Sequence, residues 1–408
     1  MFEWLKKIRP TNAQAENAEI AGSSIHESLA RPKTQNESVD YKHLGDACLK
    51  AGAVDDAVRH YRKALAIDAQ FAEAHNVLGD AFREQGQLVE AARSYRSALE
   101  IAPDLAEAHY GLGVTLLERA DAQNAAVYFQ NALRLKPDLA RAHNAHGCAL
   151  LVSGRQTEAL ACFQKAISLD PDDGMASHLM ASLTGSNPER APGQYIEKLF
   201  DGFANTFDAH LRSLKYETPK HLLALIAQVS APAPGKWNVL DLGCGTGLVG
   251  LEIAPYASQL IGVDLSAKML QKARARNHYH RLEQSDLLMM MKNETASIYD
   301  LIVATDTFIY LGKLDEIARE TRRLLREGGL FAFSVEALES LPNHESNQGS
   351  SPGYRLQPSP SCRYAHSSQY LSKLAADNGF KIHHMKMEHL RVSYGDPVNG
   401  YLVVMARQ

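Results

Sequence analysis

Apolar positions follow two different spacings along the chain, and the change between them divides it near residue 186. Between residues 38 and 173, small and aromatic residues return every 34 positions. Beyond residue 194, short apolar runs alternate with stretches of helical spacing. We therefore expect a flexible segment over 1–37, a repeat domain over 38–186 and a second domain over 187–408.

Four kinds of position keep the 34-residue step. They are Leu44-Gly45, Leu78-Gly79, Leu112-Gly113 and His146-Gly147; Ala57, Ala91, Ala125 and Ala159; Tyr61, Tyr95, Phe129 and Phe163; and Pro103, Pro137 and Pro171. Small residues let two helices approach closely, an aromatic ring fills the space between them, and proline ends a helix. The pattern resembles the tetratricopeptide repeat. This resemblance implies an α-solenoid of four repeats, with a final capping helix over 174–186.

The resemblance also implies a concave groove that binds a peptide or protein segment. In the last two repeats the expected groove positions are apolar: Tyr110, Val114, Leu117, Cys148, Leu151 and Val152. Such a wall either packs on the next helix of the same chain or meets an external partner. The sequence leaves both alternatives open.

The second domain shows the alternation of strands and helices that is typical of a doubly wound parallel sheet. We expect strands over 237–242, 259–264, 281–284, 300–304 and 329–335, with helices over 248–254, 267–276 and 314–326. A helix over 368–378 and two closely linked strands over 381–387 and 400–405 suggest an antiparallel edge. The fold class is therefore α/β, of the Rossmann-like kind, behind an α-solenoid.

A glycine-rich loop, Gly243-Cys-Gly-Thr-Gly247, follows the first strand and precedes a helix. Glycines there let backbone amides approach a ligand beside a helix N-terminus. Asp264, at the end of the next strand, is placed to accept from both hydroxyls of a ribose. These features alone also fit a dinucleotide-dependent dehydrogenase.

Three further features favour a different ligand. Asp241 precedes the loop, Asp286 follows the third strand, and residues 300–306 form the fourth strand and its edge. Together they resemble a class I S-adenosylmethionine-dependent methyltransferase. The whole chain resembles the bacterial family that joins tetratricopeptide repeats to such a domain (methyltransferase type 11/12).

The resemblance implies a role for each matching residue in binding S-adenosyl-L-methionine. The loop glycines surround the methionyl part and ribose, Asp241 orients the ammonium group, and Asp264 holds the ribose hydroxyls. The adenine lies against Leu265 and Leu287, and Asp286 accepts from its amine. Asp286 could instead serve only as a helix cap. The expected cofactor residues are Asp241, Gly243, Gly245, Gly247, Asp264, Leu265, Asp286, Leu287 and Ala304.

The acceptor is expected beside Ala304, Thr305 and Asp306. The fourth strand continues Ala-Thr-Asp-Thr-Phe-Ile-Tyr310, which lacks the Asn-Pro-Pro-Tyr signature of amino methylation, and no Pro-Cys pair is present. The pattern is closer to methyltransferases that act on small molecules at carboxyl or hydroxyl groups. Candidate catalytic residues are Tyr310 and His366, with Tyr364 and His210 also near the expected site, because histidine can accept a proton near neutral pH.

A strongly apolar helical stripe precedes the first strand: Tyr195, Leu199, Phe203, Phe207 and Leu211. It is either a lid over the cofactor or a helix packed permanently on the domain. Residues 337–362, rich in Ser, Asn, Pro and Gly, are either a second lid or a disordered loop.

Composition narrows the function further. The net charge is −4, from 43 basic and 47 acidic residues, so we expect no nucleic-acid partner. The five cysteines are scattered without a C-x-x-C pair, which predicts a reduced, cytoplasmic chain without a bound metal. No apolar run is long enough to span a membrane. The main alternatives to small-molecule or carrier-bound methylation are a protein methyltransferase that recruits its substrate through the repeats, and a scaffold that binds cofactor without turnover.

Overall fold

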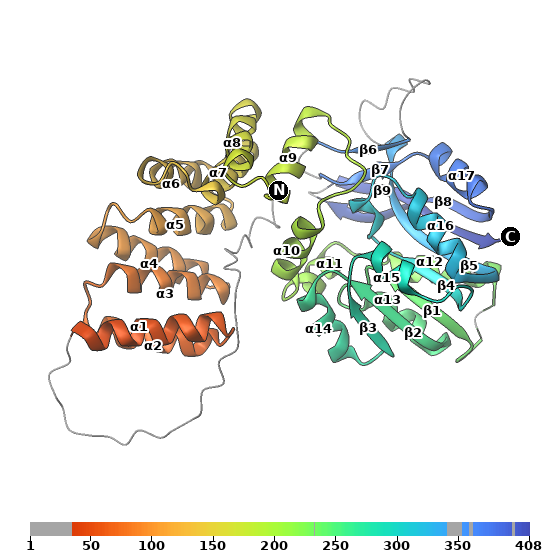
Figure 1. Ribbon diagram of the computed structural model, residues 1–408, viewed down its shortest axis with the longest axis horizontal. Helices are drawn as coiled ribbons and strands as arrows, with labels where there is room; N and C mark the ends of the chain where they lie inside the picture. The colour runs from red at the N-terminus through yellow and green to blue at the C-terminus, as the bar shows by residue number, and fades with distance from the viewer. Residues whose placement is uncertain (1–34, 232, 341–352, 359–361, 394–395) are drawn as a thin grey trace, which may run out of the picture. The chain divides into compact units, whose positions relative to one another are not determined.

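The computed structural model describes residues 35–231, 233–340, 353–358, 362–393 and 396–408 (Figure 1). The chain forms two compact units, one up to Asp172 and one from Asp173 onward. We expected the boundary at 186/187. Because the second unit begins at Asp173, it includes α9 (Gly174–Thr184), the helix that we expected to cap the repeats. Of the flexible segment expected over 1–37, only residues 35–37 are described, and they begin the first helix.

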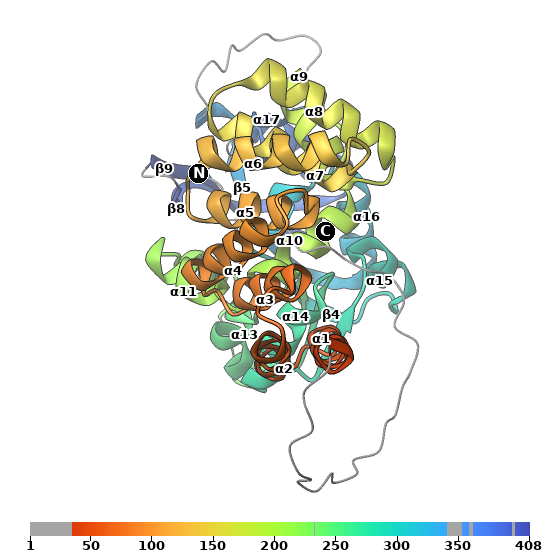
Figure 2. The same ribbon diagram turned by 90° about the vertical axis from the view of Figure 1, so that its left-hand side faces the viewer.

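The first unit consists of four helix pairs stacked in chain order, from red to yellow in Figures 1 and 2. The pairs are α1 (Gln35–Lys50) with α2 (Val54–Ile67), α3 (Ala72–Glu84) with α4 (Leu88–Ile101), α5 (Ala106–Glu118) with α6 (Ala122–Leu135), and α7 (Ala140–Val152) with α8 (Gln156–Leu169). The four-repeat solenoid predicted from the 34-residue step is confirmed.

The glycine of each repeat lies against the aromatic ring of the same repeat. A Cβ built on Gly79 would lie 2.8 Å from Cε1 of Tyr95, and one built on Gly113 would lie 2.7 Å from Cε1 of Phe129. Both distances are shorter than any ordinary carbon contact. The ring therefore fills the space between the paired helices only because the facing residue has no side chain.

The type of aromatic residue in each repeat accounts for the type of residue that follows the glycine. In the second repeat, the hydroxyl of Tyr95 donates to Oδ1 of Asp80 (2.6 Å), and the first repeat has the same bond between Tyr61 and Asp46 (2.9 Å). In the third and fourth repeats the ring is phenylalanine, and the corresponding residues are the apolar Val114 and Cys148. A ring without a hydroxyl needs no buried acceptor, which accounts for two of the six apolar groove positions.

Five of those six positions are buried: Tyr110, Val114, Leu117, Cys148 and Leu151. Val152 is half-buried. Burial of these side chains does not identify what the groove binds, so a partner for the groove stays a prediction.

The second unit is built on a sheet of order β3-β2-β1-β4-β5, all parallel: β1 (Trp237–Leu242), β2 (Ala257–Asp264), β3 (Arg281–Gln284), β4 (Tyr299–Ala304) and β5 (Leu325–Ala337). Beyond β5, β9 (Asp396–Arg407) pairs antiparallel with it, and β8 (Phe380–Ser393) pairs antiparallel with β9. The expected doubly wound sheet with an antiparallel edge is confirmed.

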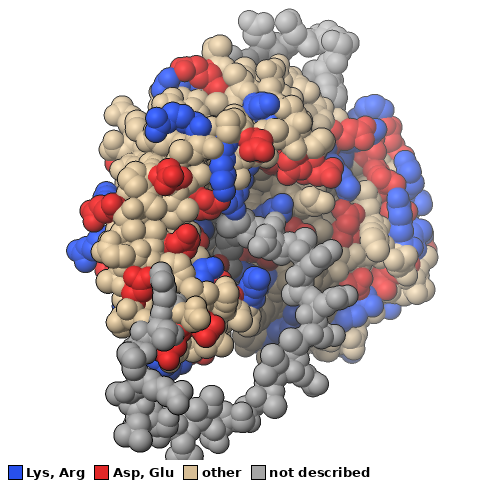
Figure 3. Space-filling view, turned by 60° about the vertical axis from the view of Figure 1, so that its left-hand side comes forward, with Lys and Arg blue, Asp and Glu red and all other residues tan. Residues whose placement is uncertain are grey.

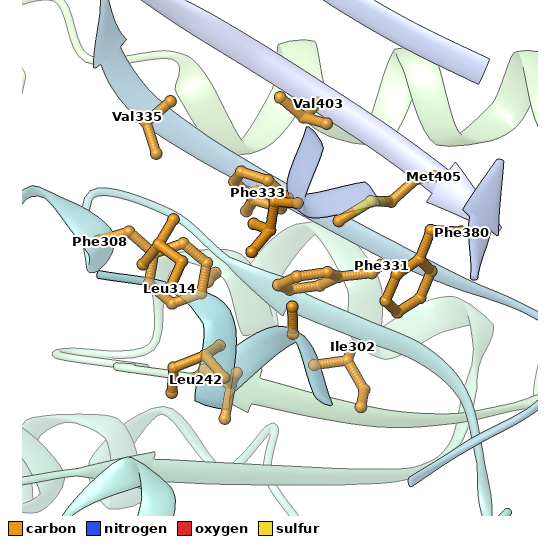
Figure 4. Close-up of a cluster of buried hydrophobic side chains, with 14 of the residues drawn as sticks. Leu242, Ile302, Phe308, Leu314, Phe331, Phe333, Val335, Phe380, Val403 and Met405 are labelled. Carbon is orange, nitrogen blue, oxygen red and sulfur yellow. The ribbon is translucent and has the colours of Figure 1, made fainter. Parts of the chain in front are cut away.

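Alternate residues of the central strands enter two hydrophobic cores, one on each face of the sheet. Ile302 and Phe331 point to the face covered by α15 (Leu287–Asn293), α16 (Asp315–Leu324) and α17 (Ser368–Asp377). Figure 4 shows this core, where Phe331 lies beside Phe333 and Phe380. Leu301 and Leu330 enter the other core, against α12 (Thr218–Val229) and α13 (Leu248–Ile253). Burial on both faces explains why these strands read as continuous apolar runs.

Two features of the second unit differ from the sequence-based expectation. The apolar stripe over 195–211 forms two helices, α10 (Gly193–Phe203) and α11 (Phe207–Ser213), because the chain turns at residues 204–206. The loop expected over 337–362 contains a strand, β6 (Tyr354–Leu356), which pairs with β7 (Tyr364–His366), and β7 extends the end of β5. Residues 341–352 and 359–361 of that loop lie outside the described residues.

Charges are mixed on the face seen in Figure 3, where basic and acidic side chains are interspersed. No helix in the described part of the chain is long and apolar enough to cross a membrane. Nor do the described residues contain a group of three or more side chains suited to hold a metal ion.

Candidate active site

The glycine-rich loop leaves β1 and turns sharply before α13. Gly243, Gly245 and Gly247 all have positive φ values, 71°, 54° and 87°. This is the left-handed region that favours glycine. A Cβ on Gly243 would strike Thr307, with Oγ1 only 2.4 Å away, whereas a Cβ on Gly245 would have a single neighbour, Cε1 of Phe207 at 4.0 Å. Gly243 is therefore needed for packing, and Gly245 presents its backbone to open space.

Asp264, at the end of β2, is held against this loop. Its Oδ2 accepts from the backbone N–H of Gly245 (2.9 Å) and its Oδ1 from that of Ser266 (2.8 Å). Burial raises the pKa of Asp264, and the backbone N–H groups of Ser266, Gly245 and Leu265 oppose that shift. Each oxygen keeps a second lone pair, so the carboxylate can still accept two further hydrogen bonds at the loop.

Asp241 is fully buried in β1, directly before the loop. Its Oδ2 accepts from the hydroxyl of Tyr279 (2.6 Å). Its Oδ1 has no hydrogen-bond partner within the described part of the chain. Burial raises the pKa of Asp241 to about 7, against the bond from Tyr279. A buried oxygen without a donor is costly, and a ligand that brings a donor would satisfy it.

Residues 193–213, which we call the covering segment, are fastened over the loop by two acids. On α10, Oδ1 of Asp201 accepts from Oγ of Ser266 (2.6 Å) and from the N–H of Lys268 (3.2 Å). On α11, Oδ1 of Asp208 accepts from Oγ1 of Thr246 (2.6 Å), and its Oδ2 is bonded to Arg276. The segment thus bridges the glycine loop and the end of β2.

The sequence did not point to Asp201 and Asp208 as site residues. The available signal was their position: both are acids within a strongly apolar stripe. Only the fold brings them to the loop.

On the expected adenine side, the structure supports the capping role of Asp286. Its Oδ1 accepts from the N–H groups of Leu288 (3.0 Å) and Met289 (3.3 Å) at the start of α15, and its Oδ2 accepts from Arg190 (3.0 Å). Leu265 and Leu287 are half-buried near the same strand ends. An adenine-binding role for these three residues stays a prediction.

At the carboxyl ends of β4 and β5 lies a second polar cluster, which we call the Asp306–Arg391 network. It comprises Asp306, Glu336, Gln357, Arg363 and Arg391. Arg391, on β8 and only 2% exposed, donates from Nη1 to Oδ2 of Asp306 (2.7 Å) and from Nη2 to Glu336. Gln357 also donates to Glu336, and Nη1 of Arg363 lies 3.6 Å from it. Ala304, fully buried, ends β4 next to this cluster.

The two predicted catalytic residues have different surroundings. Burial raises the pKa of Tyr310, and the neighbouring cation Arg363 of the network opposes that shift. His366, on β7, is fully buried, and its Nε2–H donates to the carbonyl of Gly312 (2.9 Å). Burial lowers the pKa of His366 to about 4, so the ring is neutral at physiological pH. Catalytic roles for both stay predictions.

The other two candidates, Tyr364 and His210, lie on β7 and α11, and their roles stay predictions. Tyr364 packs with α9, where its ring lies 6.2 Å from that of His178. His210, on α11, lies 6.3 Å from the ring of Phe203. The sequence did not point to Glu336 or Arg391 as site residues, because only long-range strand pairing brings them to Arg363.

Comparison with known families agrees with both units. A family model described as a methyltransferase domain matches residues 239–329. Models of the tetratricopeptide repeat match residues 45–82, 79–118, 106–139 and 140–173. Together these matches cover the glycine loop, β2, β4 and all four helix pairs.

Among curated relatives, a malonyl-[acyl-carrier protein] O-methyltransferase of Geobacter sulfurreducens is 32% identical over 145 residues, which are 34% of this chain and 52% of that protein. Human methyltransferase-like protein 27 is 38% identical over 84 residues, 20% of this chain and 34% of that protein. The chain thus spans about half the length of the first of these relatives and a third of the second. A solved S-adenosylmethionine-dependent methyltransferase from Methanosarcina mazei shares 17% identity, covers 44% of this chain and 96% of its own, and has a TM-score of 0.36.

Proposed function

We propose that this chain, which joins tetratricopeptide repeats to a methyltransferase domain, transfers a methyl group from S-adenosylmethionine to a small-molecule or carrier-bound acceptor. The observation that carries the proposal is the pairing of an open, left-handed Gly245 with the Asp264 carboxylate that its own N–H orients. Backbone at Gly245 can approach a ligand, and the acid beside it can accept from hydroxyl groups.

The residues present fit S-adenosylmethionine in two further respects. The ligand carries an ammonium group, and Oδ1 of Asp241 is a buried acceptor without a donor among the described residues. Its ribose carries two hydroxyls, and Asp264 keeps free lone pairs on both oxygens. Asp241, Asp264 and the loop glycines would therefore hold the cofactor, with Leu265, Asp286 and Leu287 toward its adenine and Ala304 toward its methyl group.

When bound, the cofactor supplies a methyl group on a sulfonium, which is already activated for displacement. The task of the protein is to align the acceptor and exclude water, and alignment alone can lower a barrier by about 7–11 kcal/mol. The covering segment serves the second task. Phe207 lies over Gly245, and its ring is 6.0 Å from that of Phe200, which in turn lies 5.5 Å from Tyr310. This row of rings would shield the transfer from solvent.

Two observations bear on the acceptor. The Geobacter relative is named for malonyl groups on an acyl carrier protein, which supports a carrier-bound acceptor here. The repeats support a protein-interaction role, and with it the alternative that a protein held by the repeats is itself methylated.

Incubation of the full chain with methyl-labelled S-adenosylmethionine and a bacterial extract tests the proposal. We expect label in an extractable small product or on a carrier protein, and none with Asp264→Ala. Label on the amino-acid side chains of a protein that binds the repeats would favour the alternative. A chain that binds cofactor yet labels nothing would be a scaffold, and the proposal would fail.

A further inference from the structure

We propose that the Asp306–Arg391 network recognises a carboxylate on the acceptor, so that the product of the reaction is a methyl ester. This inference rests on the proposed function and names the chemical class of its substrate. The network lies at the carboxyl ends of β4 and β5, the edge at which open α/β sheets bind their ligands. β8 runs parallel to β5, because both pair antiparallel with β9, and so brings Arg391 to the same edge.

The buried centre of the network contains an unsatisfied donor. Arg391 is 2% exposed, and its two terminal nitrogens donate to Asp306 and Glu336. Its Nε is buried and has no hydrogen-bond partner among the residues that the structure describes. Buried N–H groups in native proteins are almost always paired, so this N–H would be satisfied by an acceptor that the described residues do not supply.

The network contains more N–H donors than carboxylate acceptors. Each arginine offers five N–H groups and Gln357 offers two, whereas the network contains two carboxylates. Glu336 alone faces Arg391, Gln357 and Arg363. The Arg363–Glu336 distance, 3.6 Å, is longer than a hydrogen bond, and the Arg363 side chain is 27% exposed. Arg363 is therefore the part of the network that a ligand can reach, and its planar fork matches a carboxylate.

A row of aromatic rings connects the network to the glycine loop. Beside the larger effect of burial, which raises the pKa of Tyr310, the nearby cation Arg363 lowers it, and the ring of Tyr310 packs edge-on against Phe200. The row of rings then continues through Phe207 to Gly245. A group held by Arg363 would thus lie on the same side of the domain as the methyl donor.

The backbone at Asp306 adds support. This residue has φ = +53°, unusual for a side chain other than glycine. It is held there by the bond from its N–H to Oγ of Ser334 (2.9 Å) and by the Arg391 contact. Strained residues of this kind cluster at ligand sites, where surrounding bonds fix them.

A basic hollow lies next to the network. It has a volume of about 390 Å³ and is lined by Arg212, Lys215, Tyr216, Glu217 and Lys220. Three of these side chains are cations and one is an anion. Tyr216 lies near the network, because beside the larger effect of burial, which raises its pKa, Asp306 raises that pKa and Arg391 lowers it. An excess of positive charge beside the site favours the approach of an anionic acceptor.

Methylation of a carboxylate needs no general base. One carboxylate oxygen forms a bond to the methyl carbon while the methyl–sulfur bond breaks, and the sulfur keeps the electron pair. The products are a neutral ester and S-adenosylhomocysteine, and no proton moves. The buried, neutral His366 is then not required as a base. Because Asp306 and Glu336 already balance both arginines, loss of the acceptor charge does not leave an uncompensated cation.

The test compares full-length wild type with Arg363→Gln and Arg363→Lys, and with Arg326→Gln as the control. Arg326 makes an exposed ion pair with Asp300 at the opposite edge of the sheet. Each protein receives methyl-labelled S-adenosylmethionine and a bacterial extract, and the product is treated with mild alkali, which releases methanol from esters only. S-adenosylhomocysteine affinity is measured by calorimetry.

We expect alkali-labile label from wild type and from the control. Arg363→Gln should lower the rate by about 10–100-fold at limiting extract, and concentrated extract should restore part of it, because the loss is in acceptor binding. Arg363→Lys should retain an intermediate rate, and S-adenosylhomocysteine affinity should be unchanged in all variants. Alkali-stable label would overturn the inference and leave the proposed function intact. Equal ester formation by Arg363→Gln would also overturn it. No label in any product would contradict the proposed function itself.

Discussion

Removal of the Asp208 carboxylate should free the covering segment from the glycine loop. In the structure this side chain accepts from Thr246 (2.6 Å) and is paired with Arg276. A hydrogen bond to a charged group contributes about 1.5–3 kcal/mol. The Arg276 pair is partly exposed, with 23% and 30% of the two side chains accessible, so it adds at most about 1 kcal/mol. Asp208→Ala should therefore favour opening of the segment by about 2–3 kcal/mol.

Hydrogen exchange followed by mass spectrometry measures that opening directly. Since each 1.4 kcal/mol is about tenfold, amides of residues 207–213 should exchange about 30–150-fold faster in Asp208→Ala. Exchange in β1 and β4 should not change. Bound S-adenosylhomocysteine should slow exchange across residues 193–213 in the wild type, if the segment closes over the cofactor.

The matched control is Glu197→Ala on α10, because the Glu197 carboxylate makes no hydrogen bond or ion pair within the described residues. It should leave exchange unchanged. If Asp208→Ala exchanges like the wild type, the two contacts do not hold the segment. If exchange rises throughout the domain and the melting temperature falls, the segment belongs to the permanent core and is not a lid.

Three further predictions follow from buried groups and contacts. Burial raises the folded-state pKa of Asp241 from its ordinary 3.8 to about 7, so ionisation destabilises the fold, and stability is lost as pH rises from about 4 to about 7. Asp241→Asn should be more stable than wild type by about 3–4 kcal/mol near pH 8 and equal to it near pH 4, by urea unfolding; a constant difference would refute this. Tyr95→Phe should cost about 1–3 kcal/mol by removing a donor from the half-buried Asp80, and adding Asp80→Val, as at Phe129 and Val114, should restore most of it; no recovery would show that the hydroxyl was not the reason for the acid. A fragment that begins at Asp173 should melt at a higher temperature than one that begins at Gly185, because only the first keeps the bond from His178 to the Cys362 carbonyl (2.8 Å). Equal melting temperatures would show that α9 does not stabilise the second unit.

The local patterns of the sequence predicted the elements closest to the observed ones. The 34-residue step predicted four helix pairs because each glycine–ring contact is made within one repeat. The parallel strands followed from short apolar runs, and the helix expected over 267–276 is α14 (Ala267–Arg276) as observed. The loop Gly243–Gly247 and Asp264 also lie together as expected, because the carboxyl ends of adjacent parallel strands share one edge.

Contacts between distant segments could not be predicted from the sequence. Asp208 meets Thr246 only because α11 crosses the loop, and Arg391 meets Asp306 across 85 positions of chain through β8. Strand β6 (Tyr354–Leu356) lies within the segment 337–362, whose composition is that of a loop, because it pairs with β7, which itself pairs with the end of β5. The sequence also could not show that His366 is buried in β7, where it donates to the carbonyl of Gly312, and its catalytic role stays a prediction.

The central claim is that the loop of Gly245 and the carboxylate of Asp264 hold S-adenosylmethionine, and calorimetric titration with S-adenosylhomocysteine tests it most directly. The full chain should bind the ligand at one site and should not bind NADH, the ligand that the loop alone would also fit. Asp264→Ala should weaken binding by about tenfold or more at an unchanged melting temperature, because each charge-assisted bond to a ribose hydroxyl contributes about 1.5–3 kcal/mol. Equal affinity in the variant, or preferential binding of NADH, would contradict the account.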